Sequence, residues 1–459
     1  MLGRNSTYGS VVGGLSLVAV ALALYLSPIG SPGVRAQDAS SSHPGAGAGP
    51  PPESDAQAIA RARHERQQSA AAGTAPASAS TTPDRLIERN VVYVPVAANP
   101  GPTTTVPPPT TTTTTTTAPS NVATFTVQTK SELVDAGSDY WGVAITGVPQ
   151  GTSQLDALDA EIERAPSELT WFEGWDQPYP SQAVETSWQH GALPMITWQS
   201  EQTSAGATQS DPTYSLSNII DGKFDAYIQT FAQAVVAEGL PVVIRLDQEM
   251  NGNWFPWSEG VNGNTSGQFV QMWRHVWNIF QAAGANNYVI WLWAPNRVDN
   301  LVHLAPMNEY YPGDAYVDWI GLDAYWRSVS TAPTFASIFG KTLADLATVS
   351  NKPIFIAETA GIETNPATGA SVSSEKVEFT TDLLQGIKAD NQIIGFSWFD
   401  NVAVDWEDGV PISNDWRIDS DAANLVAFKS GLNAGSFTNG LMPAVASTVQ
   451  LTVSRPGPS

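Results

Sequence analysis

The sequence predicts an α/β fold, a (β/α)8 TIM barrel preceded by a disordered N-terminal linker. Apolar runs alternate with amphipathic helical stretches between residues 138 and 434, as in a parallel sheet covered by helices. An open doubly wound sheet is the alternative, but no Gly-rich phosphate loop follows the first run. Eight runs fit a closed barrel, and they span residues 141–145, 169–172, 194–198, 242–246, 288–293, 319–322, 354–357 and 393–398.

Two of the intervening segments carry clear helix signals. Phe224, Tyr227, Ile228, Phe231 and Val235 share one helical face, and Gly239 and Pro241 follow as a cap and a stop. A second apolar face is formed by Phe269, Trp273, Val276, Trp277 and Phe280, with Gly284 after it. We therefore expect helices that end at Gly239 and Gly284.

The N-terminal residues 1–36 are typical of an export signal. Arg4 precedes an apolar run from Val11 to Leu26, and Val34-Arg35-Ala36 resembles a small-x-small cleavage site. An uncleaved membrane anchor is the alternative. Either interpretation predicts a secreted or cell-surface protein.

Residues 37–137 are predicted to form the linker, and residues 435–459 a C-terminal tail. Ala, Ser, Pro, Gly and Thr dominate the linker, which includes the run Thr110–Thr117. Such a segment has too few apolar side chains to offset its ordering entropy. Within the tail, Thr448–Val453 is expected to pair as a strand or to be disordered.

The composition limits the classes of partner. The 459-residue chain has a formal net charge of -23, which disfavours nucleic acids and anionic membranes. It has no cysteine, so thiol nucleophiles and thiolate metal sites are excluded. We expect a monomer without a cofactor that binds a neutral polysaccharide.

The fourth run leads directly to a carboxylate. Glu249 follows residues 242–246, and a turn containing Asn251-Gly252 then brings Trp254 and Trp257. In a barrel, residues at the carboxyl ends of strands form the active site. A carboxylic acid beside flat indole faces suits the cleavage of a glycosidic bond. A turn cap with core tryptophans is the alternative.

The seventh run ends in a second carboxylate. Glu358 follows Ile354–Ala357, and small residues come after it. The closed barrel would place Glu249 and Glu358 on the same rim. Two carboxyl groups there can divide into a protonated acid and an ionised nucleophile, because each disfavours the ionisation of the other.

Several motifs resemble glycoside hydrolase family 26, which contains β-mannanases and related β-glucanases and β-xylanases. The resemblance covers about residues 139–434 and rests on Arg245–Trp257, Trp291–Asn296, Gly321–Trp326, Ile356–Thr359, Gly395–Asp400 and Asp415–Ser420. It implies a retaining mechanism, with Glu249 as acid/base and Glu358 as nucleophile.

The resemblance also implies roles for polar and aromatic neighbours. Tyr325 would orient Glu358, Trp398 would form the floor for the sugar being cleaved, and Asn296 and Trp254 or Trp257 would line adjacent subsites. We further predict that Trp198 and Trp406 contact the substrate. Ordinary barrel packing is the alternative for each aromatic residue.

One position departs from the family pattern. The family usually has His immediately before the acid/base, where this sequence has Gln248. An amide can hydrogen-bond a sugar hydroxyl but does not titrate. This difference bears on the substrate more than on the reaction. We expect β-1,4-mannan, with mixed-linkage β-1,3-1,4-glucan or β-1,3-xylan as alternatives.

Three other functions are disfavoured. The sequence lacks a metal-ligand pattern for metal-dependent hydrolysis. His190, His275 and His303 are scattered, and the acidic run around Asp408 does not match a calcium-binding loop. An aldolase-type barrel lacks a suitable lysine, because Lys352 precedes its strand. A non-catalytic polysaccharide-binding barrel stays open, although both carboxylates are present.

Overall fold

The computed structural model describes residues 122–135, 139–203, 210–298, 305–365, 368–407, 410–441 and 450–454. The predicted export signal at residues 1–36 and residues 37–121 of the predicted linker lie outside these ranges. Within the described ranges, no helix combines the length and apolarity needed to cross a membrane.

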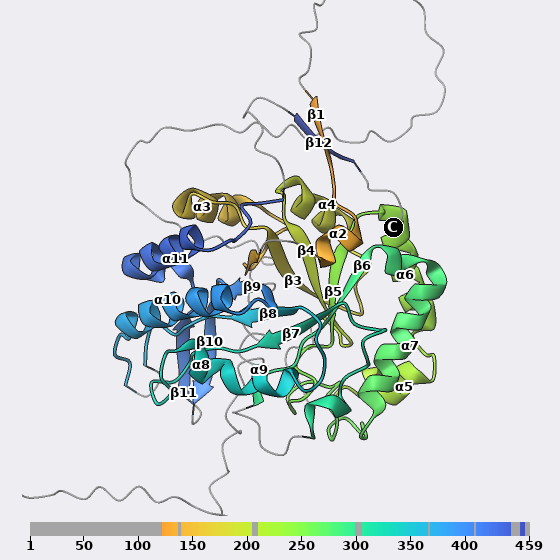
Figure 1. The fold of residues 1–459 in the computed structure, drawn as a ribbon. Coiled ribbons are helices and arrows are strands. Elements are labelled where there is room, and N and C mark those ends of the chain that lie inside the picture. The colour runs from red at the N-terminus through yellow and green to blue at the C-terminus, as the bar shows by residue number, and fades with distance from the viewer. Residues whose placement is uncertain are drawn as a thin grey trace, which may run out of the picture. The chain divides into compact units, whose positions relative to one another are not determined.

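Eight parallel strands close into a barrel in sequential order (Figure 1). Each strand pairs with its neighbours in sequence, and the last pairs with the first. This confirms the predicted fold, and all eight expected runs are barrel strands. The strands are β2 (Tyr140–Ala144), β3 (Glu168–Gly174), β4 (Leu193–Gln199), β5 (Val242–Leu246), β6 (Val289–Trp293), β7 (Trp319–Asp323), β8 (Ile354–Thr359) and β9 (Ile393–Phe399).

Helices surround the barrel, and the two predicted in detail are present. The longer helices include α6, which ends at the left-handed Gly239, and α7, which ends at the left-handed Gly284. Glycine adopts this conformation without the steric cost that a Cβ imposes. The helices are α3 (Ser153–Ile162), α4 (Ser181–Gln189), α5 (Leu216–Ile220), α6 (Asp225–Glu238), α7 (Gln268–Ala283), α8 (Phe335–Ile338), α9 (Gly340–Leu346), α10 (Ser373–Ala389) and α11 (Ala422–Ala434).

Four short 3-10 helices lie in the described parts of the connections. They are η1 (Pro212–Tyr214), η2 (Ala285–Asn287), η4 (Met307–Glu309) and η5 (Ile418–Ser420). A hairpin of two antiparallel strands, β10 (Val402–Glu407) and β11 (Val410–Asp415), follows β9. Asp405 and Glu407 of the acidic run, interpreted from sequence as a loop at the substrate cleft, therefore lie in β10, and Asp408 lies outside the described residues.

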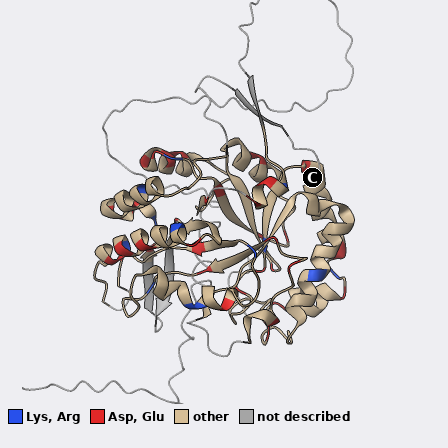
Figure 2. Cartoon of the chain, in the orientation of Figure 1, with Lys and Arg blue, Asp and Glu red and all other residues tan. Residues whose placement is uncertain are grey.

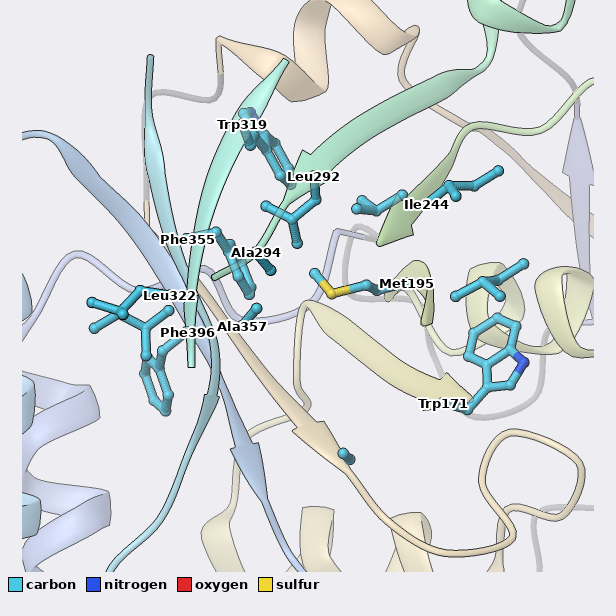
Figure 3. Packing of buried hydrophobic residues seen from close by; sticks show 14 of the residues in the cluster. Trp171, Met195, Ile244, Leu292, Ala294, Trp319, Leu322, Phe355, Ala357 and Phe396 are labelled. Carbon is cyan, nitrogen blue, oxygen red and sulfur yellow. The ribbon is translucent and has the colours of Figure 1, made fainter. Parts of the chain in front are cut away.

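The strands are buried on both faces. Figure 3 shows apolar side chains of the barrel strands in the buried cluster, among them Met195, Leu292, Leu322 and Phe355. Trp319 stacks on Phe355 with ring centroids 5.8 Å apart. Burial on both faces explains why the strands appear in the sequence as continuous apolar runs without alternation.

Polar groups occupy the barrel interior. Thr170 donates to Glu168 at 2.6 Å and contacts the Ser397 hydroxyl at 3.1 Å, so β3 and β9 meet inside the barrel. Glu168 is fully buried, which raises the pKa of its carboxyl to about 8. A Cβ at Gly142 would overlap that carboxyl group, and glycine is needed there. The interior therefore has defined polar positions below the rim formed by the carboxyl ends of the strands.

Ordered elements also lie outside both expected boundaries of the barrel domain. The predicted linker extends to residue 137, but β1 (Val122–Thr126) and α2 (Lys130–Val134) are formed within it. Leu133 is fully buried, and its carbonyl accepts the Tyr140 hydroxyl at 2.9 Å. After the expected barrel end at residue 434, Phe437 is still buried. β12 (Gln450–Ser454) pairs in parallel with β1, so the strand alternative applies to this part of the tail.

Candidate active site

The turn after β5 places Glu249 at the barrel rim. The strand ends at Leu246, and Asp247 and Glu249 then adopt φ angles of 45° and 57°. Such left-handed conformations are costly for non-glycine residues and often occur at functional sites. The Glu249 amide donates to Ala294 O at 2.7 Å, which ties the turn to the end of β6. The strained turn is thus held by its neighbouring strand.

The Glu249 carboxyl accepts two hydrogen bonds from neutral donors. Asn296 Nδ2 donates to Oε1 and Trp254 Nε1 donates to Oε2, both at 2.7 Å. The side chain is buried. Burial and the nearby Glu358 raise the pKa of Glu249 to about 7, although the two donors and Arg245 oppose this rise. Glu249 therefore carries a proton in mildly acidic solution and can act as an acid.

The Glu358 carboxyl has different partners. It lies within β8, where Oε1 accepts from Arg245 Nη1 at 2.6 Å and Oε2 accepts from the Tyr325 hydroxyl at 2.7 Å. The ion pair with Arg245 is buried. A guanidinium and a phenol stabilise the carboxylate anion and fix its orientation. Glu358 is thus suited to act as a nucleophile.

Arg245 is the centre of the charged network. Its side chain is fully buried and also pairs with Asp323 at the end of β7. A further bond of 3.0 Å runs to the Thr197 hydroxyl on β4. Burial raises the pKa of Asp323 well above its usual range, and Arg245 opposes that shift. One buried cation therefore holds carboxylates from two strands.

The comparisons with known proteins agree with this geometry. The family model for glycosyl hydrolase family 26 matches residues 166–362, a range that contains both glutamates. The matched segment belongs to glycosyl hydrolase family 26. Its fold was predicted from the sequence, and so was its family.

Three relatives have similar sequences. Endoglucanase H of Acetivibrio thermocellus is 31% identical over 270 residues, which are 57% of this chain and 26% of that protein. A mannan endo-1,4-beta-mannosidase of Bacillus subtilis is 25% identical over 187 residues, or 37% of this chain and 48% of the relative. A beta-1,3-xylanase of an Alcaligenes species is 28% identical over 151 residues, which are 31% of this chain and 28% of that protein. The chain thus spans less than half the length of each relative.

The residue before Glu249 is Gln248. Its side chain is buried, and its Oε1 has no hydrogen-bond partner among the described residues. Its main-chain carbonyl accepts from Trp257 Nε1 at 2.7 Å. An unsatisfied buried amide oxygen is costly unless a ligand or water satisfies it. The position of Gln248 agrees with its predicted role in substrate binding, which stays a prediction.

Three of the predicted substrate-binding tryptophans are packed elsewhere. Trp198 stacks on Phe231 of α6 at 4.3 Å, and Trp257 stacks on Phe255 at 4.4 Å. Trp398 contacts Phe428 of α11 at 5.5 Å. All three are fully buried, so none has an exposed indole face for a sugar. For these residues the packing favours the alternative, ordinary barrel packing.

The remaining predicted contacts are distributed unevenly. Trp254 and Asn296 bond Glu249, and Tyr325 bonds Glu358, so all three lie beside the two glutamates. Trp406 lies in β10, and its side chain is outside what the structure describes. Its role in substrate binding stays a prediction.

The structure also reveals site residues that we did not predict. Arg245 and Asp323 form the buried ion pair, and the rings of Phe399 and Trp416 lie 6.2 and 5.4 Å from the Tyr325 ring. A charged residue inside the apolar run 242–246 was the available signal for Arg245. The available signal for Phe399 was the polar Ser397. Ser397 lies inside the barrel, and Phe399, two positions later on the same strand, shares its face.

The pH dependence of activity offers a test of the acid. Because Glu249 must be protonated, we expect kcat/KM to fall as the pH rises through about 7. Replacing Trp254 by Phe removes a hydrogen bond that lowers the pKa of Glu249. The alkaline limb of W254F should therefore move to higher pH in a pH–rate profile. A limb at unchanged or lower pH would contradict this assignment.

Proposed function

We propose that the chain is a retaining endo-β-glycosidase that cleaves β-1,4-mannan by double displacement. The contrast between the two glutamates carries the proposal. Glu249 is held by neutral donors and has a raised pKa, whereas Glu358 is held by a guanidinium and a phenol. Opposite environments for two carboxyl groups at one rim are the requirement for an acid and a nucleophile.

In the first step, Glu358 attacks the anomeric carbon while Glu249 protonates the departing glycosidic oxygen. The bond to the leaving sugar breaks, and a glycosyl-enzyme ester forms at Glu358. In the second step, ionised Glu249 takes a proton from water, whose oxygen displaces Glu358. Burial and Glu358 raise the pKa of Tyr325 well above its usual range, so its hydroxyl keeps its proton and orients the nucleophile.

Mannan is favoured by relatives named as mannan endo-1,4-beta-mannosidases. Mixed-linkage β-glucan is a second candidate, because the match to endoglucanase H covers more of this chain than the match to the Bacillus subtilis relative. The two matches cover 57% and 37% of the chain. Gln248 also supports this candidate, since it replaces the histidine expected from the family resemblance. Export directed by residues 1–36 stays a proposal that rests on the sequence alone.

Product analysis tests the reaction and the substrate together. The full chain would be incubated with mannan, lichenan, β-1,3-xylan and cellulose, and the products identified by mass spectrometry. We expect oligosaccharides from mannan. Proton NMR at early times should show the β-anomer first, as retention requires. Initial release of the α-anomer would contradict double displacement, and no product from any polymer would favour the binding barrel.

A further inference from the structure

The turn that carries Glu249 contains a buried carboxyl group that the proposed reaction does not use. Figure 2 shows acidic residues spread over the helices around the barrel, such as α3 and α10. Asp247, in contrast, is fully buried. It directly follows β5 and lies two residues before Glu249. A buried carboxyl group is costly unless hydrogen bonds satisfy it, so the contacts of Asp247 indicate its role.

Both carboxyl oxygens of Asp247 accept hydrogen bonds from one residue. The Ser200 amide donates to Oδ1 at 2.7 Å, and the Ser200 hydroxyl donates to Oδ2 at 2.8 Å. Ser200 is also fully buried, and it directly follows β4. The Asp247 amide donates to Trp198 O of β4 at 3.1 Å. Asp247 therefore joins the turn after β5 to the end of β4 through both its main chain and its side chain.

This link lies at a strained part of the main chain. Asp247 and Glu249 have φ angles of 45° and 57°, in the left-handed region that residues other than glycine seldom adopt. Such conformations persist only where the surrounding structure determines them. On one side, the Glu249 amide donates to Ala294 O, just after β6. On the other side, Ser200 binds Asp247. The turn is thus held from both neighbouring strands.

The donors to the Glu249 carboxyl have a different origin. Asn296 comes from the chain after β6, and Trp254 comes from the loop that continues the turn, whereas Ser200 comes from β4. If the turn moved away from β4, the main chain of Glu249 would move with it. A general acid must lie within hydrogen-bond reach of the oxygen that it protonates, and a displacement of about 1 Å can cost about a hundredfold in rate.

We propose that Asp247 is a positioning residue, whose two bonds to Ser200 hold the turn so that the Glu249 carboxyl reaches the departing glycosidic oxygen. The inference rests on the proposed function of Glu249 as the acid. A leaving group that departs only when protonated depends on the position of Glu249, whereas one that departs readily as an anion does not. Loss of the two bonds should therefore affect poor leaving groups selectively.

Substrates that differ only in the leaving group test this role. We would measure kcat/KM, which reports the first step, for dinitrophenyl and phenyl β-mannobiosides and for the corresponding β-cellobiosides. Asp247→Ala should lower kcat/KM for the phenyl glycoside roughly 10- to 100-fold and for the dinitrophenyl glycoside no more than about threefold. A smaller amount of folded protein would instead lower both values equally, so equal losses would overturn the positioning role.

Three further variants serve as controls. In Asp247→Asn, the amide oxygen can accept from the Ser200 amide and the NH2 group can donate to the Ser200 hydroxyl, so selectivity close to wild type is expected. Ser200→Ala removes the hydroxyl bond and should give a smaller selective loss. Asp176→Ala is the matched control, because Asp176 Oδ1 accepts from the Thr203 amide and hydroxyl at 2.8 and 2.6 Å in loops after β3 and β4. It should leave both rates unchanged.

The outcomes separate the positioning role from the proposed function. If Glu249→Ala shows the selective loss and Asp247→Ala does not, the positioning role alone is overturned. A selective loss in Asp247→Asn as large as in Asp247→Ala, or one of that size in Asp176→Ala, would also overturn it. If Asp247→Ala does not fold, as judged by circular dichroism, Ser200→Ala decides the matter in the same way. If the wild type hydrolyses none of the glycosides, or Glu249→Ala shows no selectivity, the proposed function fails and the positioning role fails with it.

Discussion

Replacing Glu358 by alanine is expected to lower kcat by a factor on the order of 10⁴ to 10⁶. The variant lacks the carboxylate that forms the proposed glycosyl-enzyme ester, and among the described residues no other carboxyl group is bonded by both Arg245 and Tyr325. Rates would be measured on an aryl glycoside and on the polymer. Far-ultraviolet circular dichroism would show whether the barrel remains folded.

Azide distinguishes the roles of the two glutamates. In Glu358→Ala, azide can occupy the vacated space and attack the sugar directly, which gives a glycosyl azide of inverted configuration. In Glu249→Ala, azide would instead attack the ester at Glu358, and the product would keep the configuration of the substrate. Products of the same configuration from both variants would contradict the assignment.

The control for these variants is Glu173. It also lies near the end of a barrel strand, and burial raises its pKa to about 7. Its carboxyl accepts from Trp171 Nε1 at 3.0 Å, and it is not bonded to Arg245 or Tyr325. Glu173→Ala should therefore keep kcat within a few-fold of wild type. Comparable losses in Glu173→Ala and Glu358→Ala would show that any buried carboxyl group matters equally.

The barrel could be predicted because its signals are local in the sequence. Each strand is a short apolar run, and Gly239 and Gly284 mark helix ends within a few residues of the next strand. The proximity of Glu249 and Glu358 could also be predicted. In a closed parallel barrel every carboxyl end lies on one rim, so two glutamates near strand ends must share it.

The orientation of the aromatic residues could not be predicted in the same way. A barrel strand is apolar on both faces, so its sequence does not say which residues point inward. At the end of β9, Phe399 contacts Tyr325, and Trp398 packs against α11 instead. Only the polar Ser397 indicates which residues of β9 point into the barrel, because its hydroxyl contacts Thr170 there.

Partners that are distant in the sequence were also beyond prediction. Arg245 stood out as a charge in an apolar run, but Asp323 and Glu358 lie 78 and 113 residues further along the chain. Nothing local pairs them. The early ordered segment was missed for a different reason. The biased composition of the preceding residues obscured Leu133, whose burial helps to attach α2 to the barrel.

Replacing Arg245 by methionine is expected to lower the free energy of unfolding by roughly 3–5 kcal/mol. The substitution keeps a long side chain but leaves Asp323 and Glu358 buried without their cation. Urea unfolding would measure the loss. Arg417→Met is the matched control, because the Arg417 side chain is 43% exposed beside Asp415. Removing such a surface pair should cost no more than about 1 kcal/mol.

The loss in Arg245→Met should grow with pH. Burial raises the pKa of folded Asp323, and without Arg245 it would rise further. A carboxyl whose folded pKa lies above its unfolded value of about 3.9 stabilises the fold below that pH. This contribution disappears as the pH rises through the folded pKa. The loss of unfolding free energy in Arg245→Met should therefore be larger at pH 7.5 than at pH 5. Adding Asp323→Asn to Arg245→Met removes one unpaired charge and should recover part of the stability at pH 7.5. A deficit that is independent of pH, or no recovery in the double variant, would mean that Arg245 stabilises the barrel by packing rather than by neutralising the buried carboxylates.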